Sequence, residues 1–269
     1  MVVIGGQAAT LFAANASTPS TTSDQAREAA RRAIPLSRVS REYRGKVSQV
    51  LKDPSIYRRL PTEVVDCQPE MFTMLAQNPE VLVEIWRKLG VSKVQLVRTG
   101  PNTLDLTDGM GTTGTLVIVE QLCEPGAQNR IVMYSEGRYE GKPFTRPVTA
   151  SCVLLLTSGS MQETNGRHYV AARMDTFVRI DRPSLEILAK AVHPWVGKTT
   201  DRNFVDTMTF ISNFSYTAEN RPQTIARLAE DLDRVDAARK NKLVRIAHEC
   251  AEAGAGLRQA SAVTRSARK

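Results

Sequence analysis

The sequence predicts an α+β fold, in which a curved antiparallel sheet is followed by long C-terminal helices and preceded by a helical extension. Apolar residues recur with helical spacing up to about residue 89, with two-residue spacing from about 94 to 180, and with helical spacing again after Pro183. Short turns separate the strand-like segments, which indicates antiparallel neighbours. With 269 residues, of which 42% are hydrophobic, the chain is long enough to form a large core.

Residues 1–16 have the composition of the later half of a secretory signal peptide. They are apolar, rich in alanine and uncharged, and they end in Ala14-Asn15-Ala16, a small-residue cleavage pattern. No basic residue precedes Arg27, so the leader is incomplete, as a start codon assigned too far downstream would explain. We expect export to the periplasm or secretion; a disordered apolar tail on a cytoplasmic protein is the alternative. No transmembrane span is expected, because such a span needs about 20 apolar residues.

Residues 17–63 are expected to form a basic linker and helical extension. Residues 17–23 are Ser, Thr and Pro, with too little apolar content to pack. Helical spacing predicts helices over 25–33 and from about 36 to 50. A proline-bounded, irregular connector is expected over 51–61.

The folded unit is expected to span residues 64–235. Two helices are predicted over 69–77 and 79–89, each with a proline at its first position. The two-residue period then predicts strands, with Gly, Pro and Asn in the connections between them. These strands cover residues 94–98, 103–107, 114–121, 129–137, 149–157 and 168–180.

The last predicted strand shows which side of the sheet is apolar. One face carries Val170, Ala172, Met174, Thr176, Val178 and Ile180. The other face carries Arg173 and Asp175, which we interpret as an ion pair on a solvated surface; a contact with a ligand head group is the alternative.

Helices are expected after this sheet. The first runs from Pro183 to His193, a turn follows over 195–200, and the second begins at Asp201, which is a suitable N-cap. Residues 236–269 are expected to be a basic, Ala-rich tail, helical to Cys250 and loose beyond Gly254.

The net charge of +8 belongs to the flanks of the chain. Residues 24–60 hold 10 Lys and Arg against 4 Asp and Glu, and residues 234–269 hold 9 against 3, whereas the stretch between them is mildly acidic. Such flanks suit an anionic membrane surface, or they are solvated segments that keep the chain soluble. No aromatic residues alternate with the basic ones, so no specific nucleic acid is expected.

No motif for catalysis, a cofactor or a metal is found. The four cysteines, Cys67, Cys123, Cys152 and Cys250, form no C-x-x-C pair, and their disulfide pairing is left open. Residues 109–114 match G-x-G-x-x-G, but the β-branched residues that follow indicate a glycine-rich turn and not a dinucleotide site. His193 is interpreted as a helix C-cap or a core histidine and not as a catalytic base. We therefore expect no enzyme and no catalytic residues.

Several motifs between residues 64 and 235 resemble a known group. They are Asp66-Cys67, Pro79-Glu80-Val81, Ile85-Trp86, Arg98-Thr99-Gly100-Pro101, Gly137 with Tyr139-Glu140-Gly141, and the run from His193 to Lys198 with Asp201 and Asn203-Phe204. The chain resembles exported bacterial proteins, of a planctomycete type, with a START-like (helix-grip, SRPBCC-type) domain. The resemblance implies a sheet that wraps around a long C-terminal helix and a deep cavity for a lipid, isoprenoid or other hydrophobic molecule.

The functional hypothesis is binding or transfer of a hydrophobic small molecule between the sheet and the helix from Asp201. The candidate cavity residues are Met174, Thr176 and Val178 on the last strand and Phe204, Met208 and Ile211 on the helix. A protein-interaction module without a ligand is the first alternative, and an enzyme with the same fold is the second. Because one fold hosts many functions, the fold alone does not decide between them.

Overall fold

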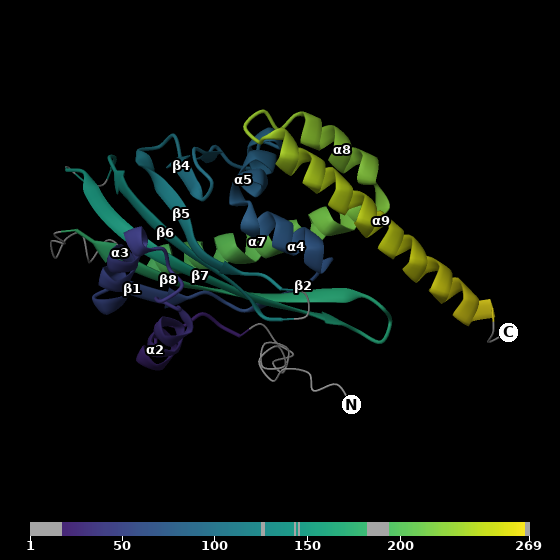
Figure 1. The fold of residues 1–269 in the computed structure, drawn as a ribbon, viewed down its shortest axis with the longest axis horizontal. Helices are drawn as coiled ribbons and strands as arrows, with labels where there is room; N and C mark the ends of the chain where they lie inside the picture. The colour runs from purple at the N-terminus through teal and green to yellow at the C-terminus, as the bar shows by residue number, and fades with distance from the viewer. Residues whose placement is uncertain (1–17, 125–126, 143, 145, 182–193, 267–269) are drawn as a thin grey trace.

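The computed structural model describes residues 18–124, 127–142, 144, 146–181 and 194–266. An antiparallel sheet of eight strands forms its centre, in the order β1-β8-β7-β6-β5-β4-β3, with β2 also paired to β8 (Figure 1). The strands are β1 (Ile56–Arg59), β2 (Glu63–Asp66), β3 (Gln95–Arg98), β4 (Thr103–Thr107), β5 (Thr112–Leu122), β6 (Asn129–Tyr139), β7 (Val148–Gln162) and β8 (His168–Ile180). The α+β class and the meander from β3 to β8 are as the sequence predicts.

Helices lie on both faces of this sheet. In chain order they are α2 (Asp24–Ala33), α3 (Arg41–Lys52), α4 (Pro69–Gln77), α5 (Pro79–Lys88), α7 (Pro194–Asn220), α8 (Pro222–Glu230) and α9 (Ala237–Ser266). The long helices α7 and α9 follow the sheet, and α9 extends beyond the rest of the fold (Figure 1). This arrangement is that of a helix-grip fold.

The G-x-G-x-x-G sequence is the turn of the β4–β5 hairpin, and not a phosphate loop. Gly109 and Gly111 have φ angles of 69° and 116°, which side chains rarely adopt. A Cβ on Gly111 would lie 2.1 Å from the carbonyl oxygen of Glu140. Asp108 completes the turn, because its carboxylate accepts hydrogen bonds from the backbone of Met110 and Thr112.

The inner face of the sheet, which α7 covers, carries the larger core. Strand residues such as Ile131 and Met133 share one hydrophobic cluster with Met74 of α4, Met208 of α7 and Ile246 of α9. The cluster therefore joins the sheet to helices from both the middle and the end of the chain.

The outer face is also covered, contrary to the solvated face expected for β8. Helices α2 and α3 pack there in a second cluster that includes Ala30, Val47, Tyr57 and Phe177. Tyr57 and Phe177 pair across β1 and β8, with ring centroids 4.9 Å apart. The N-terminal helices thus complete the fold on this side.

Asp175 of the expected Arg173–Asp175 pair is accordingly buried, and Arg173 is half-buried, so the pair is not on a solvated surface. Asp175 is fully buried and accepts hydrogen bonds from the hydroxyl of Tyr57 (2.6 Å) and from Nε of Arg59 (2.7 Å). Nε of Arg173 lies 3.6 Å from the same carboxylate. Because Arg59 also donates to the carbonyl of Ala26, the cluster joins α2, β1 and β8.

Several segments differ from the expected secondary structure; β2 was not predicted, and β7 extends to Gln162 and not to residue 157. The predicted connector contains β1, which pairs with β8 from Ile56 to Arg59. The predicted turn at 195–200 is helical, because α7 begins at Pro194 and proline is well suited to a first helical position. The C-terminal tail is helical to Ser266 and not loose after Gly254. The helix predicted from Pro183 to His193 lies outside the described residues.

Packing also crosses both positions, 64 and 235, at which the sequence suggested limits of the folded unit. On the C-terminal side, Leu243 and Cys250 of α9 belong to the inner core. Arg239, near the start of α9, lies 3.0 Å from buried Glu80 of α5, which also pairs with Arg98 of β3.

Candidate functional site

A partly accessible, mostly apolar surface lies on the inner face of the sheet. We call it the inner-face floor. Its residues are half-buried and come from four neighbouring strands: Leu116, Ser135, Cys152, Leu154, Met174, Thr176 and Val178. The register makes the surface continuous, because Ser135 pairs with Cys152, and Cys152 pairs with Val178. Since paired residues in an antiparallel sheet point to the same side, these side chains share the face that carries the inner core.

The floor differs from the opposite side of the same strands. On the outer face, Val117, Tyr134, Val153 and Phe177 are at most 5% exposed beneath the N-terminal helices. On the inner face, Cys152 keeps accessible surface, although burial raises the pKa of its thiol to about 12. A residue that is surrounded by protein and still keeps some accessible surface borders space that is not completely filled. The inner face is therefore less tightly filled here than the outer face.

The six predicted cavity residues divide into two groups. Met174, Thr176 and Val178 belong to the floor. Phe204, Met208 and Ile211 of α7 are buried in the inner core, against which Met174 also packs. Among the residues that the structure describes, none of the six lines the pockets at the start of α7, beside α3 or between α4 and α9, so their role as cavity walls stays a prediction.

An ion pair joins the edge of the floor to α7. Arg58 of β1 pairs with Thr176 of β8 in the sheet register, and the hydroxyl of Thr176 donates to the carbonyl of Arg58. The guanidinium of Arg58 reaches Asp201 of α7, with Nε 2.7 Å from the carboxylate. The hydroxyl of Ser20 donates to the same carboxylate at 2.7 Å. The pair thus joins the N-terminal segment, the edge strand and the helix.

The ion pair stabilises the charged forms of both Arg58 and Asp201. Burial alone would raise the pKa of Asp201, but hydrogen bonds from Arg58 and Ser20 and the nearby guanidinium bring it below its ordinary value. The hydrogen bond to Asp201 raises the pKa of Arg58. Gly197 leaves room for the guanidinium, because a Cβ there would lie 3.0 Å from Cζ of Arg58.

A pocket of about 640 Å³ lies beside this pair. Its described lining is Lys198, Thr199, Asp201 and Arg202, all near the start of α7. We call it the α7 pocket. Asp201 belongs both to this pocket and to the ion pair, so the pocket adjoins the Arg58 end of the floor.

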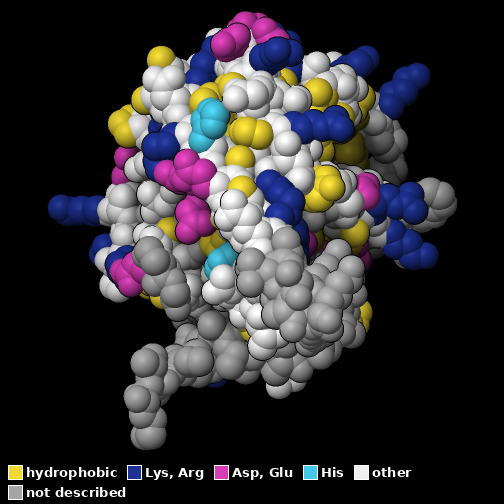
Figure 2. Space-filling model, turned by 90° about the vertical axis from the view of Figure 1, so that its right-hand side faces the viewer, with side chains coloured by type: hydrophobic (Ala, Val, Ile, Leu, Met, Phe, Trp, Pro, Cys, Tyr) yellow, Lys and Arg dark blue, Asp and Glu magenta, His cyan; other side chains and the backbone are white. Residues whose placement is uncertain are grey.

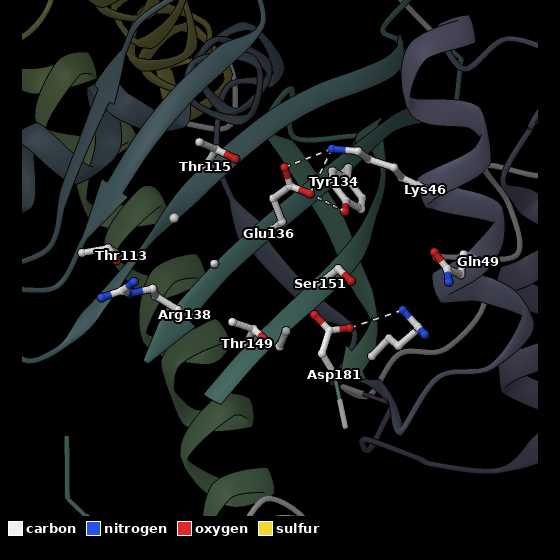
Figure 3. Close-up of a pocket in the computed structure, with 14 residues that line it drawn as sticks. Lys46, Gln49, Thr113, Thr115, Tyr134, Glu136, Arg138, Thr149, Ser151 and Asp181 are labelled. Carbon is white, nitrogen blue, oxygen red and sulfur yellow. Dashed lines mark hydrogen bonds and ion pairs between the residues drawn. The ribbon is translucent and has the colours of Figure 1, made fainter. Parts of the chain in front are cut away.

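A second pocket, of about 620 Å³, lies on the outer face beside α3 (Figure 3). Two polar rows cross the strands there, Thr115–Glu136–Ser151–Arg179 and Thr113–Arg138–Thr149. Lys46 reaches from α3 to both oxygens of Glu136 at 3.0 Å, and Tyr134 donates to the same carboxylate. Arg179 pairs with Asp181 at 3.4 Å. The charges largely neutralise one another, as expected for a solvated sheet surface.

A third pocket, of about 440 Å³, lies between α4, α9 and the strand ends near Cys123 and His168. Burial raises the pKa of the Cys123 thiol, which opposes the nucleophilic thiolate that a Cys–His mechanism needs. On the face of the molecule shown in Figure 2, acidic, basic and hydrophobic side chains are interspersed, and no single kind dominates.

The sequence indicated only part of this site. The sequence did not identify Leu116, Cys152 and Leu154 as floor residues. A two-residue period shows which side chains of one strand share a face, but only the register shows which residues of the next strand lie beside them. Arg58 was missed because its segment was predicted to be an irregular connector. Asp201 was predicted as an N-cap, whereas it lies within α7 and binds Arg58.

The cysteines, the helices and the side chains that could bind a metal each bear on the partners of the chain. All four cysteines are free thiols. No helix in the described part of the chain is long and apolar enough to cross a bilayer. In these same residues, no group of three or more His, Cys, Asp or Glu is placed to hold a metal ion.

Comparison with known proteins gives only a distant structural similarity. No family model matches the chain, and no curated protein matches it. Among solved structures, the crystal structure of CalU16 from Micromonospora echinospora is similar at 14% identity, covering 75% of this chain and 89% of that chain, with a TM-score of 0.29. This score is too low to support an argument about fold or function.

Proposed function

We propose that this protein binds or transfers a hydrophobic small molecule, of lipid or isoprenoid type, on the inner-face floor beneath α7. The observation that carries the proposal is the difference between the two faces of the same strands. The floor is half-buried and mostly apolar, whereas the outer face at the same level is tightly packed. When a ligand covers an apolar surface that was accessible to water, the binding free energy becomes more favourable by about 25 cal/mol per Å² of apolar surface buried.

The composition of the floor indicates the general character of the ligand. Leu116, Leu154, Met174 and Val178 offer apolar contacts, and Met is a side chain that adapts to irregular shapes. Ser135 and Thr176 bring hydroxyl groups, but both are already engaged with backbone carbonyls. The floor itself thus suits a hydrocarbon body better than a polar one.

The test compares two neighbouring residues of β7 that point to opposite faces. Cys152→Trp places an indole on the floor, and Ser151→Trp places one in the open outer pocket. The full chain is purified, extracted with organic solvent and analysed by native and denaturing mass spectrometry, and binding of the neutral probe Nile red is measured.

We expect the wild-type chain and Ser151→Trp to carry or bind the apolar ligand, and Cys152→Trp to have lost it while it keeps a cooperative thermal transition. Equal binding by both variants would contradict the floor as the site. A wild-type chain that carries no lipid and ignores the probe would favour an interaction module instead.

Export and contact with an anionic membrane through the basic flanks are also proposed. The apolar stretch ending in Ala14-Asn15-Ala16 supports export. On α2, the flanking charges are partly paired locally, since Arg31 and Arg32 both contact Glu28. On α9, Arg239 and Arg245 are likewise paired, with Asp236 and Glu249, so membrane contact is proposed for both flanks alike.

A further inference from the structure

We propose that the hydrophobic ligand carries an anionic head group, a carboxylate or a phosphate, which is held at the α7 pocket by Lys198 and Arg202. This inference rests on the proposed function, because it assigns a polar end to a ligand whose apolar body lies on the floor.

The first step is that the α7 pocket continues the floor. Asp201, Phe204, Met208 and Ile211 follow one another at intervals of three or four residues, so they share one face of α7. The last three are buried in the inner core, and Asp201 extends the same stripe to Arg58. Arg58 in turn adjoins Thr176, a floor residue. An apolar body on the floor therefore ends next to this pocket.

The second step is the charge at this end. The described lining of the pocket holds two cations, Lys198 and Arg202, and one carboxylate, Asp201, which pairs with Arg58 of β1. Asp201 is engaged by Arg58, whereas Lys198 and Arg202 have no ion-pair partner among the residues that the structure describes. Both side chains are exposed at the rim. Among the described lining residues, this charge balance favours an anion and disfavours a cationic head group.

The third step is the position of the two cations. Lys198 and Arg202 are four residues apart, so they lie on one side of α7 about one turn from each other. Two neighbouring cations can share one carboxylate or phosphate, and charge-assisted hydrogen bonds of this kind are stronger than neutral ones. A neutral alcohol would leave both cations solvated and would gain little from them.

The experiment measures displacement of Nile red from the full-length protein by ligands that share a 16-carbon chain. Palmitate, a lysophosphatidylglycerol of the same chain length, hexadecanol and hexadecyltrimethylammonium are compared, each below its micelle concentration. We expect the anionic ligands to compete at about tenfold lower concentration than hexadecanol. Preference for palmitate alone would point to free fatty acids, and preference for the lysolipid alone to phospholipid head groups.

The variant Lys198→Ala/Arg202→Ala is expected to lower the affinity for palmitate to that for hexadecanol. The affinity for hexadecanol itself is expected to stay the same. Both residues are exposed, so the fold is expected to be unaffected. The matched control is Arg41→Ala, which removes an exposed arginine of α3 on the opposite face. It is expected to change neither the affinity for palmitate nor the affinity for hexadecanol. Asp201→Asn removes the competing carboxylate and is expected to strengthen palmitate binding.

Hexadecanol binding as tight as palmitate in the wild type, or an unchanged palmitate affinity in the double variant, would overturn the anionic head group and leave the proposed function standing. If none of the four ligands displaces the probe, or the probe itself does not bind, the proposed function fails as well.

Discussion

The hydroxyl of Tyr57 donates a 2.6 Å hydrogen bond to the carboxylate of Asp175, which is fully buried between the sheet and the N-terminal helices. The two residues are 118 positions apart, on β1 and β8. Arg59 and Arg173 lie against the same carboxylate. This cluster holds the edge strand and α2 to the sheet, and it gives the first prediction.

Asp175→Ala is expected to lower the free energy of unfolding by about 3–5 kcal/mol, because it leaves two arginines without their buried partner. Tyr57→Phe removes one hydrogen bond and is expected to lower it by about 1–2 kcal/mol. Urea denaturation followed by circular dichroism measures both values. Asp206→Ala, at an exposed carboxylate on α7, serves as the control, with an expected change within about 0.5 kcal/mol. A similar small effect for Asp175→Ala would show that the cluster does not hold the fold together.

The second prediction concerns the fit of Arg58 against Gly197. In a helix, Ala is favoured over Gly by up to about 1 kcal/mol, but a Cβ at position 197 would lie 3.0 Å from Cζ of Arg58. Gly197→Ala is therefore expected to stabilise the Arg58→Ala background and to give less stabilisation, or none, in the wild type. A double-mutant cycle by urea denaturation measures this coupling. If Gly197→Ala stabilises both backgrounds equally, the glycine is not needed for the guanidinium.

The third prediction is the pH dependence of the Arg58–Asp201 pair. The pKa of Asp201 in the folded state is below its ordinary value near 3.8, so the carboxylate is favoured by folding. Its contribution to stability is then complete above the unfolded pKa, and it is lost as pH falls through the lower folded pKa. Between pH 5 and pH 2, the unfolding free energy of Asp201→Asn is expected to fall less steeply than that of the wild type. Equal slopes in equilibrium urea titrations would show that Asp201 does not titrate with folding.

The sequence predicted the elements best where a local signal was strong. The limits predicted for α4, β4 and β8 coincide with those observed. Prolines at the first positions of α4 and α5 and glycines with positive φ at the β4–β5 turn are local features that need no tertiary information.

The N-terminal part was less predictable because its structure depends on distant residues. The four residues of β1 include two arginines, and they lie in a segment with prolines at positions 54 and 61, which is typical of a loop. They form a strand because β8 supplies hydrogen-bonding partners and Phe177 and Asp175 receive the side chains of Tyr57 and Arg59. In the same way, the apolar floor was identified on one strand, and its extension over β5, β6 and β7 required the register.

The last prediction concerns the reactivity of the four thiols, since the thiolate is the reactive form. Burial raises the pKa of Cys67, Cys152 and Cys250 to about 12, so very little thiolate is present in these residues at pH 8. Burial also raises the pKa of Cys123, but less than for the other three thiols, and this half-buried residue lines the pocket beside α4. Reaction with Ellman's reagent at pH 8 is therefore expected to show one faster thiol and three slow ones, and Cys123→Ala is expected to remove the fast phase. In the unfolded protein, all four thiols should react at similar rates. A fast phase that persists in Cys123→Ala would mean that another cysteine, such as Cys152 on the floor, is open to the reagent.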